Sequence, residues 1–164
     1  MQPTGWEVGG ARAWRSIRKF RVGKAAHEDT RNVQAAALDA CEAGCDVLAF
    51  MRDRDRDFAR QQAIDDGIAL VGVPAVIGGV ATPTLEGWIL ALLGVRRSED
   101  LSSKRAEDSL ADNGVPRKDG AAMVRVVEEA DLAAIPEDAA SLRAWLGRAR
   151  DVLPPLVAER AGDG

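Results

Sequence analysis

At the end of one hydrophobic run of the chain, aspartate occupies three alternate positions. The segment DVLAFMRDRDRD (residues 46–57) carries Asp53, Asp55 and Asp57 directly after apolar residues, with an arginine before each of them. Carboxylates at this spacing repel one another unless positive charge lies among them. The interleaved arginines are one source of that charge. The sharper hypothesis is a divalent cation, Mg²⁺ or Mn²⁺, which prefers carboxylate and phosphate oxygens as ligands.

The elements around this motif predict how the aspartates are positioned. Residues 28–43 and 56–67 have helical patterns, each followed or closed by a glycine. Residues 45–51 form a short apolar run that is typical of a buried strand, and residues 68–78 predict one or two more strands. The order helix, strand, helix, strand favours an α/β protein with a mainly parallel sheet.

Such a sheet binds ligands beyond the carboxyl ends of its strands. Asp53 and Asp55 come directly after the predicted strand, so their place in the fold agrees with their chemistry. In an extended segment, side chains two positions apart project to the same side, and both carboxylates would therefore face one ligand. Asp57 either extends this cluster or begins the next helix.

Glu86 is the single charged residue of another apolar segment, ATPTLEGWILALLGV (residues 81–95). Thr82 is expected to cap a helix there, with Pro83 in the first turn and Gly94 at the end. The helix is apolar on all sides, which predicts that it is mostly buried. Its carboxylate therefore either complements the helix dipole in the first turn or shares a cation with the aspartates.

The remainder of the chain predicts a polar stretch at 97–120, with a loop at 113–120, and two amphipathic helices at 121–132 and 136–153. Trp145 belongs to the apolar stripe of the last helix and is expected to pack in the core. The sequence thus predicts three parts: a basic N-terminal segment at 1–27, a single α/β domain at 28–153 and a flexible tail at 154–164.

Charge and composition restrict the class of protein. The net charge of the chain is −4, which excludes a polycation that coats nucleic acid indiscriminately. Residues 1–30 nevertheless carry six basic against three acidic residues, and the remainder is net acidic. This basic stretch is either a solvated surface or a nucleic-acid contact. The candidate nucleic-acid-binding residues are Arg18, Lys19, Arg21 and Lys24.

Residue types that are few or absent indicate the cellular setting and argue against several reaction classes. Cys41 and Cys45 are expected to be two thiols in a reducing cytoplasm, and neither a signal peptide nor a membrane span is evident. The chain has no tyrosine and one histidine, His27, which excludes a tyrosine nucleophile and leaves a Ser-His-Asp triad without support. It also has no glycine-rich Walker loop.

Two stretches together resemble a known group of proteins. DVLAFMRDRDRDFARQQAID (46–65) followed by TPTLEGWILALLG (82–94) is similar to the Toprim-like domains of an uncharacterised bacterial family related to RloB and OLD-type nucleases. IRKFRVGK (17–24) is similar to the basic stretch before the first helix of that group. The resemblance covers roughly residues 15–150. It implies a Toprim-like (Rossmann-like), mainly parallel sheet flanked by helices, with a helical C-terminal part.

The resemblance also implies a function, a metal-dependent nucleic-acid phosphodiesterase with a role in phage defence. It implies that Asp53 and Asp55 are metal ligands with Glu86 nearby. Together with the residue chemistry, this predicts Asp53, Asp55 and Glu86 as catalytic residues and Asp53, Asp55 and Asp57 as ligands of Mg²⁺ or Mn²⁺. The expected partners are nucleic acid and a protein or second copy of the chain, which the apolar helix around Trp88 could face.

Two alternatives stay open beside the nuclease. Toprim domains open with a strand that leads to a glutamate, and the acidic residue before residue 28 is Glu7 in the segment GWEVGG. The glutamate therefore either lies upstream or is lost, and in the second case the domain is a non-catalytic binding or regulatory module. An aspartyl phosphotransferase of the haloacid-dehalogenase type also has Asp-x-Asp after a strand, but it expects Thr or Val where this chain has Asp57.

Overall fold

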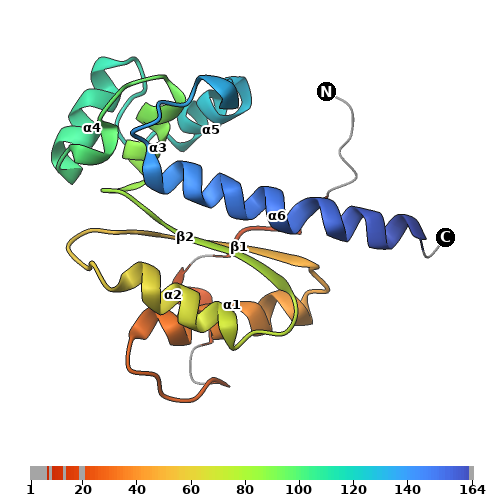
Figure 1. Cartoon of the computed structure of the whole chain (residues 1–164). Helices are drawn as coiled ribbons and strands as arrows, with labels where there is room; N and C mark the ends of the chain where they lie inside the picture. The colour runs from red at the N-terminus through yellow and green to blue at the C-terminus, as the bar shows by residue number, and fades with distance from the viewer. Residues whose placement is uncertain (1–6, 8, 13, 19–20, 163–164) are drawn as a thin grey trace. The chain divides into compact units, whose positions relative to one another are not determined.

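A computed structural model of the chain describes residues 7, 9–12, 14–18 and 21–162 (Figure 1). Helices dominate the described chain, and two strands form its sheet, so the protein is of the α/β class. The elements in chain order are η1 (Trp14–Ser16), α1 (Glu28–Glu42), β1 (Val47–Asp53), α2 (Arg60–Ala69), β2 (Ala75–Ala81), α3 (Leu85–Leu92), η3 (Ser98–Asp100), α4 (Ser103–Asp112), α5 (Gly120–Glu129), η4 (Leu132–Ala134) and α6 (Ala140–Gly162).

The two strands pair in parallel, as the alternation of elements predicts. Ala75 N–H donates to Asp46 O (3.0 Å) at one end of the pair, and Arg54 N–H donates to Ala81 O (2.9 Å) at the other. Residue numbers therefore increase in the same direction along both strands. The apolar region at 68–78, where one or two strands were predicted, contributes to one strand, β2. This strand begins later than predicted, because Ile68 still belongs to α2.

The chain divides into two compact units, where the sequence alone predicts one domain. The first unit consists of the described parts of residues 1–50, 59–78 and 147–164, and the second consists of residues 51–58 and 79–146. The chain passes from one unit to the other within β1, β2 and α6.

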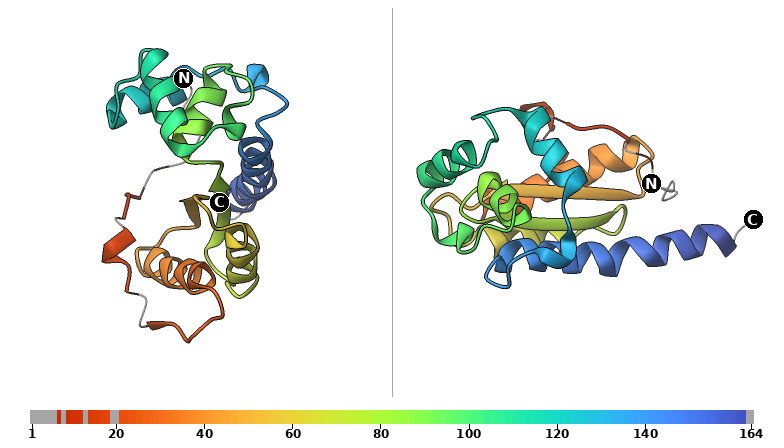
Figure 2. Two further views of the ribbon diagram at one scale, coloured as in Figure 1. Left: turned by 90° about the vertical axis from the view of Figure 1, so that its left-hand side faces the viewer. Right: turned by 90° about the horizontal axis from the view of Figure 1, so that it is seen from above.

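In the first unit, α1 and α2 lie side by side, as Figure 1 and the left view of Figure 2 show. Gly67 of α2 permits this close packing, because a Cβ atom there would lie 2.8 Å from Thr30 O and 2.9 Å from the Val33 Cβ. Thr30 Oγ1 donates a hydrogen bond to Ala63 O (2.9 Å) across the same contact. Gly78 of β2 lies against the side chains of α2 in a similar way.

A buried ion pair also joins the first turns of α1 and α2. Asp29 is 1% exposed, and its Oδ2 lies 3.0 Å from Arg60 Nε. Asn32 Nδ2 donates to the other carboxylate oxygen (3.0 Å), and His27 caps α1 by accepting the Asp29 N–H at Nδ1 (3.0 Å). The charge of Asp29 is thus compensated by a cation and a hydrogen bond, as a buried carboxylate requires.

The core of the second unit surrounds α3, which confirms that this helix is buried. One cluster joins Trp88 to residues of the first turn of α6 and to Ile135, and another joins Ile89 and Leu90 to α4 and α5. The Trp88 and Trp145 rings pack with centroids 5.8 Å apart, which confirms the predicted role of Trp145.

Glu99 anchors the start of α6 within this core. Its carboxylate accepts the N–H of Ser141 (3.0 Å) and of Leu142 (3.2 Å), which are among the first N–H groups of the helix. It also accepts the Ser141 hydroxyl (2.8 Å), and the Ser141 Oγ in turn accepts the Trp88 indole N–H (2.7 Å). A carboxylate here satisfies N–H groups that have no partner inside the helix.

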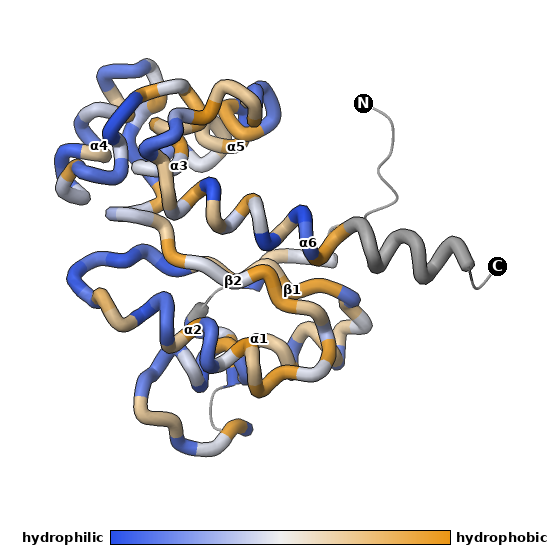
Figure 3. The backbone as a smooth tube through the Cα atoms, viewed as in Figure 1, coloured by the Kyte–Doolittle hydropathy of each residue, from blue (hydrophilic) through white to orange (hydrophobic). Residues whose placement is uncertain are grey.

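Three predictions of local structure were incomplete or wrong. The stretch 97–120 contains a further helix, α4, which is largely hydrophilic in Figure 3 but buries Ala106 and Leu110 on one face. The predicted loop at 113–120 is present apart from Gly120, which begins α5. The last helix continues to Gly162, beyond the tail predicted at 154. Among the described residues, no helix is both long and apolar enough to cross a bilayer.

Candidate functional site

The segments that follow β1 and β2 stay paired beyond the strands. Arg54 N–H donates to Ala81 O, and Asp55 N–H donates to Pro83 O (3.3 Å). Thr82–Pro83 is a cis peptide bond, and α3 begins two residues later at Leu85. This pairing holds the aspartates after β1 beside the start of α3, within the second unit.

Asp53 caps α3 from the neighbouring strand. Its Oδ1 accepts the N–H of Leu85 at 2.8 Å, the first N–H of the helix. The residue at the cap position is Thr84, whose side chain makes no capping hydrogen bond. The predicted cap, Thr82, and the prediction of Pro83 in the first turn were therefore wrong. Both residues lie before the helix because the cap acceptor comes from another part of the chain.

The pKa of the Asp53 carboxyl is raised above its ordinary value. Burial of the half-buried carboxylate is the main cause, and it outweighs the hydrogen bond from Leu85, which lowers the pKa. The negative charges of Glu86 and Asp55 raise the pKa further, and the positive charge of Arg52 lowers it. Asp55 and Glu86 therefore both interact electrostatically with Asp53. We call these three residues the acidic centre.

The geometry of Asp55 differs from the sequence expectation. β1 ends at Asp53, so Asp55 is not in an extended segment, and the argument from side-chain alternation does not hold. Its backbone has a φ of 51°, in the left-handed region. Aspartate is one of the few side chains that tolerate this region, and such strained backbone is concentrated at functional sites. Asp55 is exposed and reaches the acidic centre from a turn.

Gly87 determines how closely α3 approaches the turn before it. A Cβ atom at this position would lie 2.6 Å from Thr82 O and 2.9 Å from Pro83 Cδ, closer than real contacts of this kind. The residue between Glu86 and Trp88 must therefore be glycine for the helix to start where Asp53 can cap it. The sequence offered a signal for this constraint, since a glycine in the first turn of an otherwise apolar helix is unfavourable without a packing reason.

Asp57, whose role as a third metal ligand stays a prediction, lies in the turn after β1. Its N–H closes the turn by donating to Arg54 O (3.0 Å), and it is not among the charges that shift the pKa of Asp53.

Three of the four predicted nucleic-acid-binding residues are described, and they lie in the first unit, where Arg18 and Arg21 pair with α1. Arg21 forms a bidentate ion pair with Glu42 and lies 3.6 Å from an oxygen of Asp39, and Arg18 lies 3.8 Å from an oxygen of Glu42. The hydrogen bond to Glu42 is the main cause that raises the pKa of Arg21, and the negative charges of Glu42 and Asp39 raise it further. Lys24 is exposed. Lys19 lies outside the described residues, and Glu7 is described and exposed.

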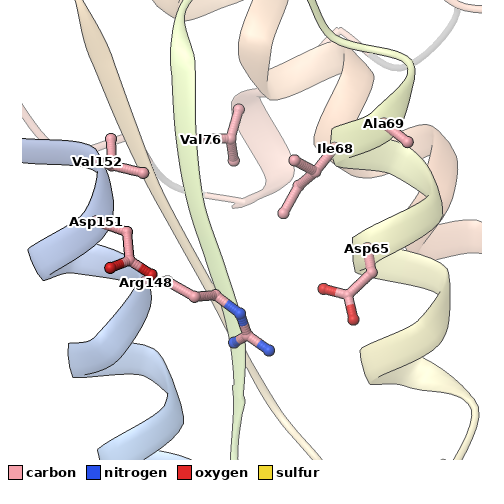
Figure 4. A pocket seen from close by; sticks show the side chains of 7 residues that line it. All are labelled: Asp65, Ile68, Ala69, Val76, Arg148, Asp151 and Val152. Atoms are coloured by element: carbon pink, nitrogen blue, oxygen red, sulfur yellow. The ribbon is translucent and has the colours of Figure 1, made fainter. Parts of the chain in front are cut away.

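A separate depression of about 320 Å³ lies in the first unit between α2, β2 and the middle of α6 (Figure 4). Its lining includes Asp65, Arg148 and Asp151, with apolar side chains beside them. Arg148 donates to Gly78 O (2.9 Å), and Asp65 accepts from Gln61 Nε2 (2.9 Å). Two of its three charged side chains therefore have structural roles.

Comparisons with known proteins add nothing to the site. No family model matches the chain, and neither a curated protein nor a solved structure is significantly similar to it.

Proposed function

We propose that the chain is a Toprim-like phosphodiesterase that uses Mg²⁺ or Mn²⁺ to cut nucleic acid, with Asp53, Asp55 and Glu86 at its active site. The observation that carries the proposal is the raised pKa of Asp53 beside two further carboxylates, at the carboxyl end of a parallel strand. Clustered carboxylates with a shifted pKa are typical of functional sites, and parallel sheets bind ligands at this edge.

The acidic centre suits a hard divalent cation. Carboxylate oxygens are the preferred ligands of such ions. Asp53 accepts the Leu85 N–H at Oδ1, which fixes its carboxylate beside the start of α3. Asp55 is exposed, and Glu86 is half-buried in the first turn of α3. When bound, a cation of this kind polarises a phosphoryl oxygen and makes a bound water more acidic.

The finer parts of the proposal follow from the resemblance given above. They are a Toprim-like, Rossmann-like fold, a role in phage defence and a place in the cytoplasm, where the chain acts with a protein partner or a second copy of itself. The basic stretch with Lys24 is the proposed contact to the nucleic-acid backbone. The alternative is a domain that has the acidic centre but does not cut, serving as a binding or regulatory module.

The test is cleavage of labelled single-stranded DNA, duplex DNA and RNA with Mg²⁺ or Mn²⁺. The variant is Asp55→Asn rather than Asp55→Ala, because asparagine keeps the shape of the side chain and tolerates a φ of 51°. Asp112→Asn, at an exposed position at the end of α4, is the matched control for loss of one negative charge.

We expect wild-type protein and the Asp112 variant to cut with either metal, and the folded Asp55 variant to lose the activity. Cutting that persists in EDTA, or in the Asp55 variant, would contradict the proposal. Metal-dependent binding of nucleic acid without cutting would favour the non-catalytic module.

A further inference from the structure

Phe58 is a large apolar side chain that the fold leaves in solvent. It lies three residues after Asp55, at the end of the turn that follows β1, and is 80% exposed. Phenylalanine is one of the residues most often buried in proteins. The turn that precedes it is hydrophilic and blue in Figure 3. Packing within the described chain therefore does not account for it.

Arg54 lies against one face of this ring. Its guanidinium carbon is 5.2 Å from the ring centroid, which is the geometry of a cation–π contact. Acidic residues stand on both sides of Arg54 in the sequence, yet its Nε is buried without a hydrogen-bond partner among the described residues. The guanidinium thus lies over the ring, and the Phe58 side chain is still 80% exposed.

We propose that Phe58 and Arg54 form a stacking platform for a base of single-stranded nucleic acid next to the acidic centre. This inference rests on the proposed function and adds the class of substrate. Aromatic side chains stack on the bases of single strands, and arginine adds a cation–π contribution. Bases inside a duplex are already stacked on one another and cannot reach a single ring on the protein surface.

The arginines of the turn, which alternate with its aspartates, offer positive charge to a strand whose base lies on Phe58. Arg54 and Arg56 lie in the same turn, and Arg56 is exposed. Their positive charges suit the phosphates of a strand that runs over the turn toward Asp55, where the scissile phosphate would meet the acidic centre. A single exposed ring offers area for one base but far less than a stable protein interface requires.

The test is equilibrium binding, followed by the fluorescence anisotropy of labelled strands in EDTA and in Ca²⁺ (a divalent ion used here to support binding). The probes are a 12-nucleotide thymidine strand, an abasic strand of equal length and a duplex of the same length. The variants are Phe58→Ala, Phe58→Leu and Phe58→Trp. Leucine keeps an apolar side chain without an aromatic face, and tryptophan keeps the aromatic face.

We expect the thymidine strand to bind more tightly than the abasic strand or the duplex. Phe58→Ala and Phe58→Leu should weaken binding of the thymidine strand by about 5- to 100-fold, while Phe58→Trp keeps it. Phe58→Ala and Phe58→Leu should not change binding of the abasic strand. They should also leave the thermal unfolding of the protein unchanged, because the ring is 80% exposed. Equal binding of the thymidine strand by wild type and Phe58→Ala, or of thymidine and abasic strands by wild type, would overturn the platform.

The outcomes separate this inference from the proposed function. Phe58-dependent binding without cutting in any metal keeps the platform and rejects the nuclease. Metal-dependent cutting with binding that is indifferent to Phe58 keeps the nuclease and rejects the platform. Absence of binding to any strand rejects both. Loss of self-association in Phe58→Ala, with strand binding unchanged, would assign the ring to a protein interface and reject the platform.

Discussion

Replacing Asp53 with asparagine should stabilise the metal-free protein and abolish its stabilisation by divalent cations. Asparagine has nearly the same shape and keeps an oxygen that can accept the N–H of Leu85, which Asp53 accepts at 2.8 Å. It removes a half-buried negative charge that burial, Glu86 and Asp55 all disfavour. Asp53→Ala removes the charge and the hydrogen bond together, so comparing the two variants separates the two effects.

The expected magnitude follows from the charges around Asp53. The carboxylate interacts with two like charges and one opposite charge, which leaves a net repulsion equivalent to about one pair. A pair that is partly exposed to solvent contributes about 0.2–1 kcal/mol. This gain corresponds to a rise in Tm of up to about 4 °C for a chain of 164 residues. Loss of a helix cap costs about 0.5–2 kcal/mol, so Asp53→Ala should be less stable than Asp53→Asn by roughly that amount.

The sign of the pH dependence follows from the raised pKa. Between the ordinary pKa of aspartate and the raised pKa in the folded protein, the folded state holds a proton that the unfolded state has released. The stability contributed by this group therefore falls as pH rises through that window. Asp53→Asn has no such group. Its advantage over wild type should be small below the ordinary pKa of aspartate and complete above the raised pKa.

Urea unfolding followed by circular dichroism, in EDTA and with Mg²⁺ or Mn²⁺, measures both effects. A cation that binds the folded state alone adds about 2.7 kcal/mol at a hundredfold excess over its Kd, and this gain should appear in wild type and vanish in Asp53→Asn. If Asp53→Asn is less stable than wild type in EDTA at neutral pH, the ionised carboxylate is net stabilising, and the argument from repulsion within the acidic centre is refuted.

Two further substitutions, one in each unit, test the packing inside that unit. Gly87→Ala brings a Cβ atom to 2.6 Å from Thr82 O and should destabilise the protein by about 1–3 kcal/mol in thermal or urea unfolding. The control is Gly147→Ala in α6, where a Cβ atom meets nothing within 4 Å and the change should be neutral or stabilising. Equal effects at both sites would contradict the close approach at Gly87. Arg60→Ala leaves the buried carboxylate of Asp29 without its cation and should cost about 3–5 kcal/mol by urea unfolding, and a loss below about 1 kcal/mol would show that water replaces the ion pair.

The sequence alone determined the elements whose patterns are local. The helix α1, the strand before Asp53 and the buried helix around Trp88 follow from the spacing of apolar residues and from the glycines near their ends. The parallel pairing of the strands follows from their alternation with helices. Helix α4 was missed because polar residues dominate it, and two buried side chains, Ala106 and Leu110, decide which face packs.

The tertiary structure decided how the acidic residues meet. Sequence spacing suggested that Asp53 and Asp55 share the side of an extended strand, but Asp55 lies in a turn with left-handed backbone. What joins them to Glu86 is the cap that Asp53 provides to α3, and this contact spans 32 positions of the chain. A pattern of neighbouring residues cannot specify such a contact, because it depends on the pairing of two strands and on the absence of a side chain at Gly87.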